Sequence, residues 1–170
     1  MSQHTHPSHD DYDNDEVKKV RSLMQDAPIC MLTSVDTDGG LVSRPMAAQE
    51  VEFDGDLWFF SEAHAPKVAN VAADPHVNVA FTGDSMWLSL KGQADIVRDE
   101  AKKKELWSSG VAAWFTDGPE DDAIVLIRVH AESAEYWDSP GKAVTAISML
   151  KTKATGGTPD VGENETVDLT

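Results

Sequence analysis

Short runs of β-forming residues, separated by tight turns, restrict the folds that this chain can adopt. The first two runs, residues 29–35 and 41–53, flank the turn sequence Asp36-Thr37-Asp38-Gly39-Gly40. Its paired glycines supply the positive φ angles that a tight hairpin needs. A second turn at Asp54-Gly55 precedes the run 57–60, which is therefore predicted to pair antiparallel with the run before it.

Three further runs bring the series to about six. Residues 77–82 alternate apolar and polar side chains, which is typical of a half-buried strand. Residues 86–98 form a longer run, in which Gly92 is expected to mark a bulge or a bend. Residues 123–136 are predicted to be the last long strand.

Helical patterns lie at the two ends of this series and in its crossovers. One helix is predicted to begin at Asn14, and another at Pro66, because proline suits the first position of a helix. Short helices are predicted after Asp99 and over residues 111–115, and a final helix over residues 143–154. A parallel sheet would need a helix after nearly every strand, so the pattern favours a small antiparallel barrel with peripheral helices.

The two ends of the chain are polar. Residues 1–13 and 156–170 are predicted to be disordered tails, which leaves residues 14–155 as one domain of ordinary size. The net charge of −16 divides accordingly: residues 1–16 hold five acids, residues 156–170 hold four, and neither segment has a base. Because such an acidic chain is repelled by phosphate backbones and has no dominant basic cluster, nucleic acid is not an expected partner.

The sequence also argues against a membrane or metal role. No basic region precedes an apolar stretch at the N-terminus, and no apolar run of about 18 residues occurs, so a cytoplasmic protein is expected. His4, His6 and His9 lack a fourth ligand, so no metal site is predicted there. Cys30 lies in an apolar run and is interpreted as a buried hydrophobe rather than a reactive thiol.

Two isolated bases stand out against this acidic background. Between Ser22 and Leu90 there are ten acids, but Arg44 and Lys67 are the only bases. Alternation places Arg44 on an apolar strand face, and Lys67 falls in the first turn of a helix, where its charge opposes the helix dipole. A phosphate between them would relieve both placements, because a helix start offers free N–H donors and arginine a two-pronged contact.

A second interpretation remains open, in which Arg44 pairs with a carboxylate in the barrel and Lys67 points to water. Ser61 ends a strand and His64 precedes the helix, so both could add hydrogen bonds to an anion. The acidic loop 117–122 and the lysines at 102–104 are interpreted as solvated surface.

Several blocks in a fixed order resemble the pyridoxamine 5′-phosphate oxidase-like FMN-binding split-barrel family. They are Ser43-Arg44-Pro45-Met46, then Asp54-Gly55-Asp56-Leu57-Trp58-Phe59-Phe60-Ser61, then Lys67-Val68. The downstream blocks are similar to the bacterial general stress protein branch of this family: Gly92-Gln93-Ala94, Lys103-Lys104-Glu105-Leu106-Trp107, Ala113-Trp114-Phe115 and Ala134-Glu135-Tyr136-Trp137-Asp138. The resemblance extends over residues 14–159.

The resemblance implies a mainly β (α+β) fold, a six-stranded antiparallel Greek-key split barrel, assembled as a homodimer with FMN at the subunit interface. It also implies which residues contact the cofactor. Arg44 and Lys67 would hold the phosphate, and Ser61 would hydrogen-bond near it. Further contacts with the flavin would come from Ser43, Pro45, Met46, Phe59 and Phe60. Trp114 would reach the flavin of the partner subunit. Packing is the alternative role for Trp114.

The expected function is that of a flavoprotein with oxidoreductase capacity and, as one option, a nicotinamide electron donor. Pyridoxal phosphate synthesis is not expected, because the family's C-terminal Arg-and-His segment has no counterpart in the closing residues. Three alternatives remain open: a non-enzymatic flavin carrier or stress-related binding protein, a barrel that holds the deazaflavin F420, and a haem-binding barrel. The sequence identifies no catalytic residue, and neither the substrate nor the stress.

Overall fold

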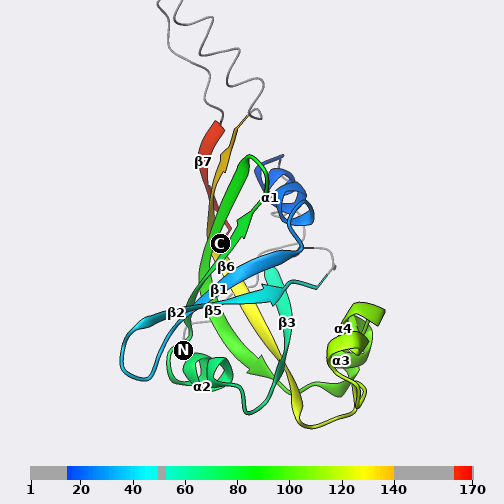
Figure 1. Ribbon diagram of the computed structural model, residues 1–170. Coiled ribbons are helices and arrows are strands. Elements are labelled where there is room, and N and C mark those ends of the chain that lie inside the picture. The colour runs from blue at the N-terminus through cyan, green and yellow to red at the C-terminus, as the bar shows by residue number, and fades with distance from the viewer. Residues whose placement is uncertain (1–14, 50–52, 140–162, 170) are drawn as a thin grey trace, which may run out of the picture.

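The structure is a computed structural model that describes residues 15–49, 53–139 and 163–169 (Figure 1). Within these residues the chain forms four helices and seven strands. In chain order they are α1 (Asp15–Gln25), β1 (Ile29–Val35), β2 (Leu41–Ala47), β3 (Asp56–Glu62), α2 (Pro66–Ala73), β4 (His76–Thr82), β5 (Met86–Val97), α3 (Glu100–Leu106), α4 (Ser109–Trp114), β6 (Ile124–Asp138) and β7 (Glu163–Asp168). None of these four helices is long and apolar enough to cross a membrane.

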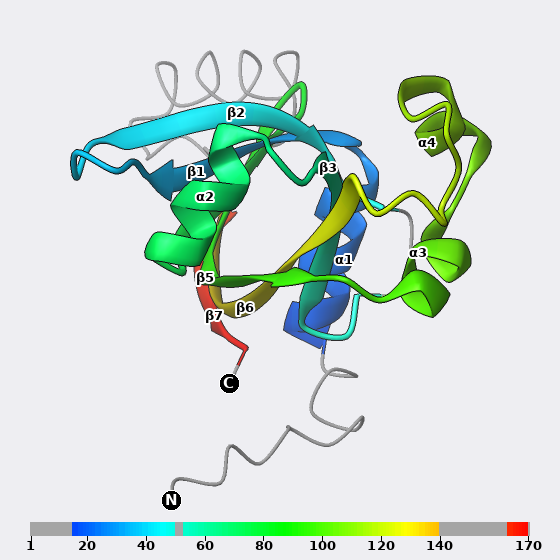
Figure 2. The same cartoon turned by 90° about the horizontal axis from the view of Figure 1, so that it is seen from below.

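The strands form one antiparallel sheet in the order β2-β1-β4-β5-β6-β3, with β7 added beside β6. Seen from below, this sheet curves into a barrel, and α2 lies across one of its openings (Figure 2). The predicted antiparallel split barrel with peripheral helices is confirmed.

The predicted hairpin between β2 and β3 is wrong. β3 pairs with β6, from Asp56 opposite His130 to Glu62 opposite Ile124. β2 ends at Ala47 instead of continuing to residue 53. Just after β2, one backbone hydrogen bond connects the chain to β3: Gln49 N–H donates to Trp58 O (3.1 Å). A turn signal is local, so it indicates where a strand begins but not which strand it joins.

The barrel interior holds the main core. Its largest fully buried side chains come from α1, β1, β3, β4, β5 and β6, among them Leu32, Phe59, Phe81, Leu88 and Ile127. α1 contributes Val17, Val20 and Leu23, which repeat every three residues and so lie on one helix face.

A second, smaller core lies under α3 and α4. It consists of Phe60, Leu106, Val111, Ile124 and Leu126. Because neighbouring side chains on a strand point to opposite faces, Phe60 faces this outer core while Phe59 faces the barrel interior.

Gly92 occupies a bulge, as predicted. The register between β5 and β6 shifts between Lys91 and Gly92. A Cβ atom at this position would lie 2.1 Å from the carbonyl oxygen of His130, which is inside any permitted contact distance. The two strands therefore approach so closely here that only glycine fits.

The expectation of a disordered segment 156–170 is wrong for its last part. Residues 163–168 form β7, which pairs with the second half of β6, from Asp138 opposite Glu163 to Ser133 opposite Asp168. Val167 and Leu169 are buried against the main core, and the Tyr136 hydroxyl donates to Glu165 Oε2 (2.9 Å). Two apolar residues in a polar stretch are too weak a pattern to predict a strand, but β6 supplies the hydrogen-bond partners that fix it. The predicted helix 143–154 and tail 1–13 lie outside the described residues.

Val167→Ala tests whether β7 belongs to the folded domain. We expect the variant to lose about 1–3 kcal/mol of unfolding free energy, because the deleted methyl groups leave a cavity beside Ala134 and the core. Urea unfolding would measure this loss. Thr166→Ala is the matched control, since the exposed Thr166 side chain should change stability by less than about 0.5 kcal/mol. Equal midpoints for the two variants would contradict the assignment of β7.

Candidate functional site

Arg44 lies on the inward face of β2. The exposed residues Leu41, Ser43, Pro45 and Ala47 alternate with half-buried or buried ones, so Arg44 shares a face with Met46. Its Nη1 atom is fully buried and has no hydrogen-bond partner. No carboxylate of the described residues forms an ion pair with it, so the structure does not support the alternative that a barrel carboxylate neutralises Arg44.

Lys67 lies directly after Pro66 in the first turn of α2. Burial lowers the pKa of its ammonium group, and the charge of Arg44 lowers the pKa further, while Glu62 acts in the opposite direction. The two cations, 23 positions apart in sequence, are therefore near enough to repel each other. The N-cap residue of α2, Ala65, provides no side-chain cap, so the positive end of the helix dipole adds to this repulsion.

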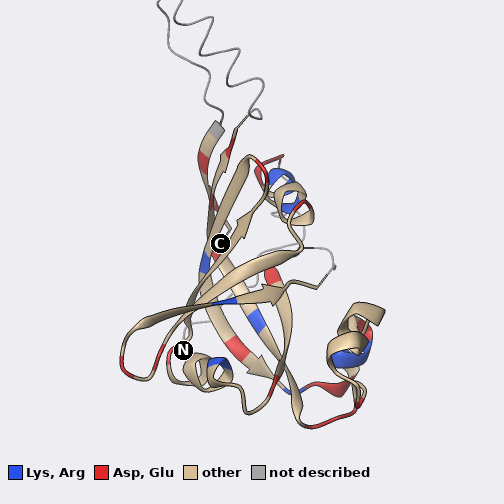
Figure 3. Ribbon diagram, viewed as in Figure 1, with Lys and Arg blue, Asp and Glu red and all other residues tan. Residues whose placement is uncertain are grey.

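Arg44 and Lys67 each stand alone as a base on their element. Figure 3 shows one basic segment on β2 and one on α2, while the other lysines and arginines lie on α1, α3, β5, β6 and the β5–α3 connection. A buried donor without an acceptor costs free energy, as does a pair of adjacent like charges. Both costs disappear when a dianion such as a phosphate group lies between Arg44 and Lys67.

Ser61 and His64 lie on the segment that leads into α2. Ser61 is buried at the end of β3, and its hydroxyl donates to the carbonyl oxygen of Glu62 (3.2 Å). His64 is exposed in the turn that follows. The structure thus places Ser61 two residues before that turn, with its hydroxyl already engaged.

The other predicted contacts are divided between different surfaces. Ser43 and Pro45 are exposed on the outer face of β2, where Ser43 Oγ and Thr33 Oγ1 are hydrogen-bonded (2.7 Å), whereas Met46 is buried inside. Phe59 has no exposed surface, and Phe60 packs against Trp107 in the outer core, with ring centroids 5.5 Å apart. The side chains of Phe59 and Phe60, both expected to contact the flavin, therefore lie on opposite faces of β3, because strand alternation separates them.

Trp114 is 84% exposed at the end of α4. The packing role that was the alternative for Trp114 is therefore wrong within the described residues of this chain. A large aromatic side chain in water is unusual, since burial of such a group is strongly favourable.

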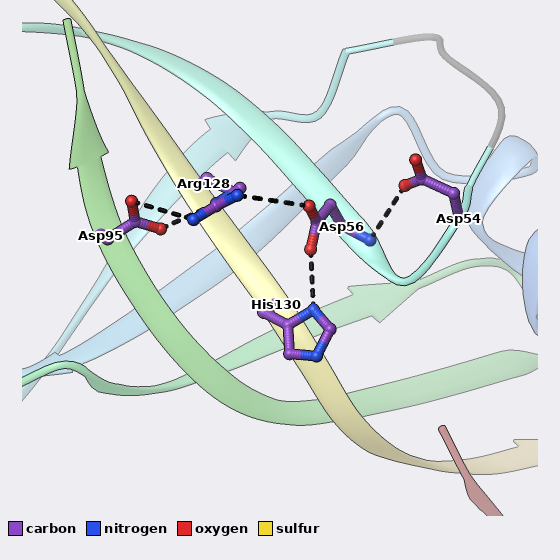
Figure 4. Close-up of polar contacts among 5 residues, drawn as sticks. All are labelled: Asp54, Asp56, Asp95, Arg128 and His130. Atoms are coloured by element: carbon purple, nitrogen blue, oxygen red, sulfur yellow. Dashed lines mark hydrogen bonds and ion pairs between the residues drawn. The ribbon is translucent and has the colours of Figure 1, made fainter. Parts of the chain in front are cut away.

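A polar network on β3, β5 and β6 was not predicted from the sequence (Figure 4). Arg128 makes two hydrogen bonds to Asp95, from Nε (2.9 Å) and Nη2 (3.2 Å), and lies 3.9 Å from Asp56. Asp56 also contacts His130 Nδ1 (2.8 Å). The hydrogen bond to Asp95 raises the pKa of Arg128, and its burial lowers it. This arginine is neutralised by neighbouring carboxylates, whereas Arg44 has no such partner among the residues that the structure describes.

The interpretation of Lys103 as a solvated surface residue is wrong. Lys103 is 4% exposed, and its Nζ donates to the carbonyl oxygens of Asp121 (2.8 Å) and Ile124 (3.2 Å). Lys104 pairs with Glu100 and Glu120. These contacts fasten the acidic loop to α3.

Cys30 is buried, as expected, and burial raises its pKa to about 12. The thiol donates to Met46 O (3.4 Å). The described residues contain no group of three or more histidine, cysteine or acidic side chains that could hold a metal ion. His4, His6 and His9 lie outside them.

A cavity of about 700 Å³ lies at the C-terminal end of α1. The α1–β1 connection, the β4–β5 turn and Asp138 line it. None of the predicted site residues contributes to this cavity.

The described residues form an antiparallel split barrel that carries two neighbouring cations, Arg44 on β2 and Lys67 in the first turn of α2. Residues 15–160 match the family described as "Pyridoxamine 5'-phosphate oxidase like", and the chain belongs to that family. The predicted family is thereby confirmed.

Three relatives illustrate this membership. Protein bli-3 of Neurospora crassa is 30% identical over 158 residues, which cover 85% of this chain and 75% of the relative. A crystal structure assigned to general stress protein 26, from Jannaschia sp. CCS1, has a TM-score of 0.74 and 26% identity, and the match covers 91% of this chain and 98% of that one. The general stress FMN/FAD binding protein of Xanthomonas citri has a TM-score of 0.60 and 31% identity, with 71% and 86% covered.

Proposed function

We propose that this protein is a flavoprotein that binds FMN through its phosphate and has oxidoreductase capacity. The observation that carries the proposal is the buried, unpartnered Nη1 of Arg44 beside Lys67 at the uncapped start of α2. Inside a barrel this arrangement is unfavourable by itself and favourable around a dianion.

The residues present fit the phosphate group of FMN. Arg44 would donate from Nη1, Lys67 would supply a point charge from Nζ, and α2 would direct its positive end at the same place. A flavin, when bound, supplies transfer of hydride or single electrons at its ring. Ser43 and Pro45, exposed on β2 beside Arg44, would position that ring from the neighbouring outer face.

The comparisons support a flavin in this role. The Xanthomonas citri relative is named for FMN/FAD binding and shares 31% of its aligned residues with this chain. We assign FMN rather than FAD because the cation pair suits a terminal phosphate group, which carries two negative charges.

We further propose a homodimer with the flavin at the subunit interface. Three large apolar side chains on the outer face of β1 and β2 are exposed: Ile29 (57%), Met31 (40%) and Leu41 (75%). Trp114 projects from α4 at 84% exposure. A second copy would cover such apolar surface and could bring Trp114 to the partner's flavin. Sedimentation of the flavin-loaded protein as a monomer would contradict this assembly.

The absorption spectrum and a titration would test the cofactor. Purified protein should show flavin bands, and apoprotein should bind FMN more tightly than F420. A haem spectrum or a preference for F420 would overturn the FMN assignment.

Reduction of bound flavin by NADH or NADPH, and its reoxidation by an added acceptor, would test the oxidoreductase role. Steady turnover would support an enzyme. Tight flavin binding without turnover by any nicotinamide donor would favour a carrier or a stress-related binding protein instead.

A further inference from the structure

Asn70 is a buried polar residue that the cation site itself does not explain. It lies on α2, one turn after Lys67, and is 2% exposed. The polar end of its side chain faces two acceptors, the carbonyl oxygen of Pro66 and Oδ1 of Asp36. The amide nitrogen must therefore point toward them, at 3.1 Å from Pro66 O and 3.2 Å from Asp36 Oδ1.

The two bonds differ in kind. Pro66 belongs to the same helix, so that bond is local. Asp36 lies in the turn that connects β1 to β2, and β2 is the strand that carries Arg44. α2 lies beside this β1–β2 hairpin (Figures 1 and 2). The Asn70–Asp36 bond therefore connects the element that bears Lys67 to the element that bears Arg44.

Asp36 is itself held firmly in the turn. Its N–H donates to Gly40 O (2.6 Å), its carbonyl oxygen accepts from Gly39 N–H (2.9 Å), and its Oδ1 accepts from Thr37 N–H (2.7 Å). Gly39 has φ of +85°, which closes the turn. Movement of Asp36 would break this set of bonds, so it is a fixed anchor for α2.

We propose that Asn70 and Asp36 form a clasp that positions Lys67 against Arg44 and so sets the affinity of the site for phosphate. The inference rests on the proposed function. Repulsion between Arg44 and Lys67 tends to separate α2 from β2 whenever no anion is bound. The clasp opposes that separation. Phosphate binding then does not include the free-energy cost of bringing Arg44 and Lys67 together, so the affinity is higher. Asn70 and Asp36 would act as positioning residues, since their effect on the ligand passes through Lys67 and Arg44.

The sign of the effect distinguishes the clasp from simple electrostatics. Asp36→Ala removes a negative charge near a cationic site, which by charge alone would tighten phosphate binding. Loss of the clasp would instead weaken phosphate binding. Asp38→Ala is the matched control: it removes the same charge from the same turn, but Asp38 Oδ1 accepts only from Gly40 N–H (2.9 Å) among the described residues.

The experiment measures the affinities of the apoprotein variants for FMN and for riboflavin by fluorescence quenching. Riboflavin lacks the phosphate, so the ratio of the two affinities reports the phosphate site and not general stability. Asp36→Ala should lower this ratio about three- to tenfold, the worth of one hydrogen bond. Asp36→Asn keeps an acceptor oxygen and should restore the ratio to within about twofold of wild type, as should Asp38→Ala.

Asn70→Ala breaks the same bond from the helix side and gives the same readout where Asp36→Ala does not fold. An unchanged ratio in the clasp variants, or equal weakening for FMN and riboflavin, would overturn the clasp. Failure of the proposed function is a separate result: in that case Arg44→Ala and Lys67→Ala leave FMN affinity unchanged in the wild-type background.

Discussion

Arg44→Ala is expected to weaken FMN binding by about 1.5–3 kcal/mol, the range for a hydrogen bond to a charged group. Lys67→Ala should have an effect of similar size. The arginine contributes a buried donor without another partner, and the lysine a charge in the first turn of α2. Fluorescence titration of the apoproteins would measure both losses.

Two features of the pair sharpen this prediction. Because Arg44 and Lys67 would hold one phosphate group, their effects should not add: the double variant should lose less than the sum of the single losses. Arg98→Ala is the control, since Arg98 is exposed and contacts only Asp122 O among the described residues, at 3.5 Å. Unchanged FMN affinity in both single variants would remove the basis for the phosphate site.

Gly92→Ala should destabilise the fold by about 3 kcal/mol or prevent folding, which is the upper range for overpacking. The added Cβ would lie 2.1 Å from His130 O and 3.1 Å from Ala131 Cα, and both are backbone atoms that cannot rotate away. β5 and β6 would have to separate at the bulge. Thermal and urea unfolding would show the loss.

Gly110→Ala is the matched control for this substitution. Gly110 lies in α4, and the nearest atom to an added Cβ there is Ser108 Oγ at 3.6 Å, an ordinary contact. Alanine suits a helix better than glycine, so stability should be unchanged or should rise by up to about 1 kcal/mol. Equal stability of the two variants would contradict the close strand approach at Gly92.

Charge contrast in the sequence drew attention to Arg44 and Lys67, because they are two bases among ten acids, one on an apolar strand face and one at a helix start. That contrast suggested a shared anion, with a carboxylate partner for Arg44 as the open alternative. In the structure the charge of Arg44 lowers the pKa of Lys67, so the two cations lie near each other, and the anion between them stays a prediction. The same reasoning could not find Asn70, because a single asparagine in a helix has no distinguishing pattern.

Periodicity and turn residues by themselves determined the six barrel strands, the helices α1 to α4 and the bulge at Gly92, because these depend on neighbours in the chain. Only the tertiary structure decided that β3 joins β6, that residues 163–168 add a seventh strand, and that Phe60 faces a second core. Those outcomes depend on hydrogen bonds and packing partners that lie far away in sequence. The clasp between Asn70 and Asp36 is of the same kind, since it exists only where α2 meets the β1–β2 hairpin.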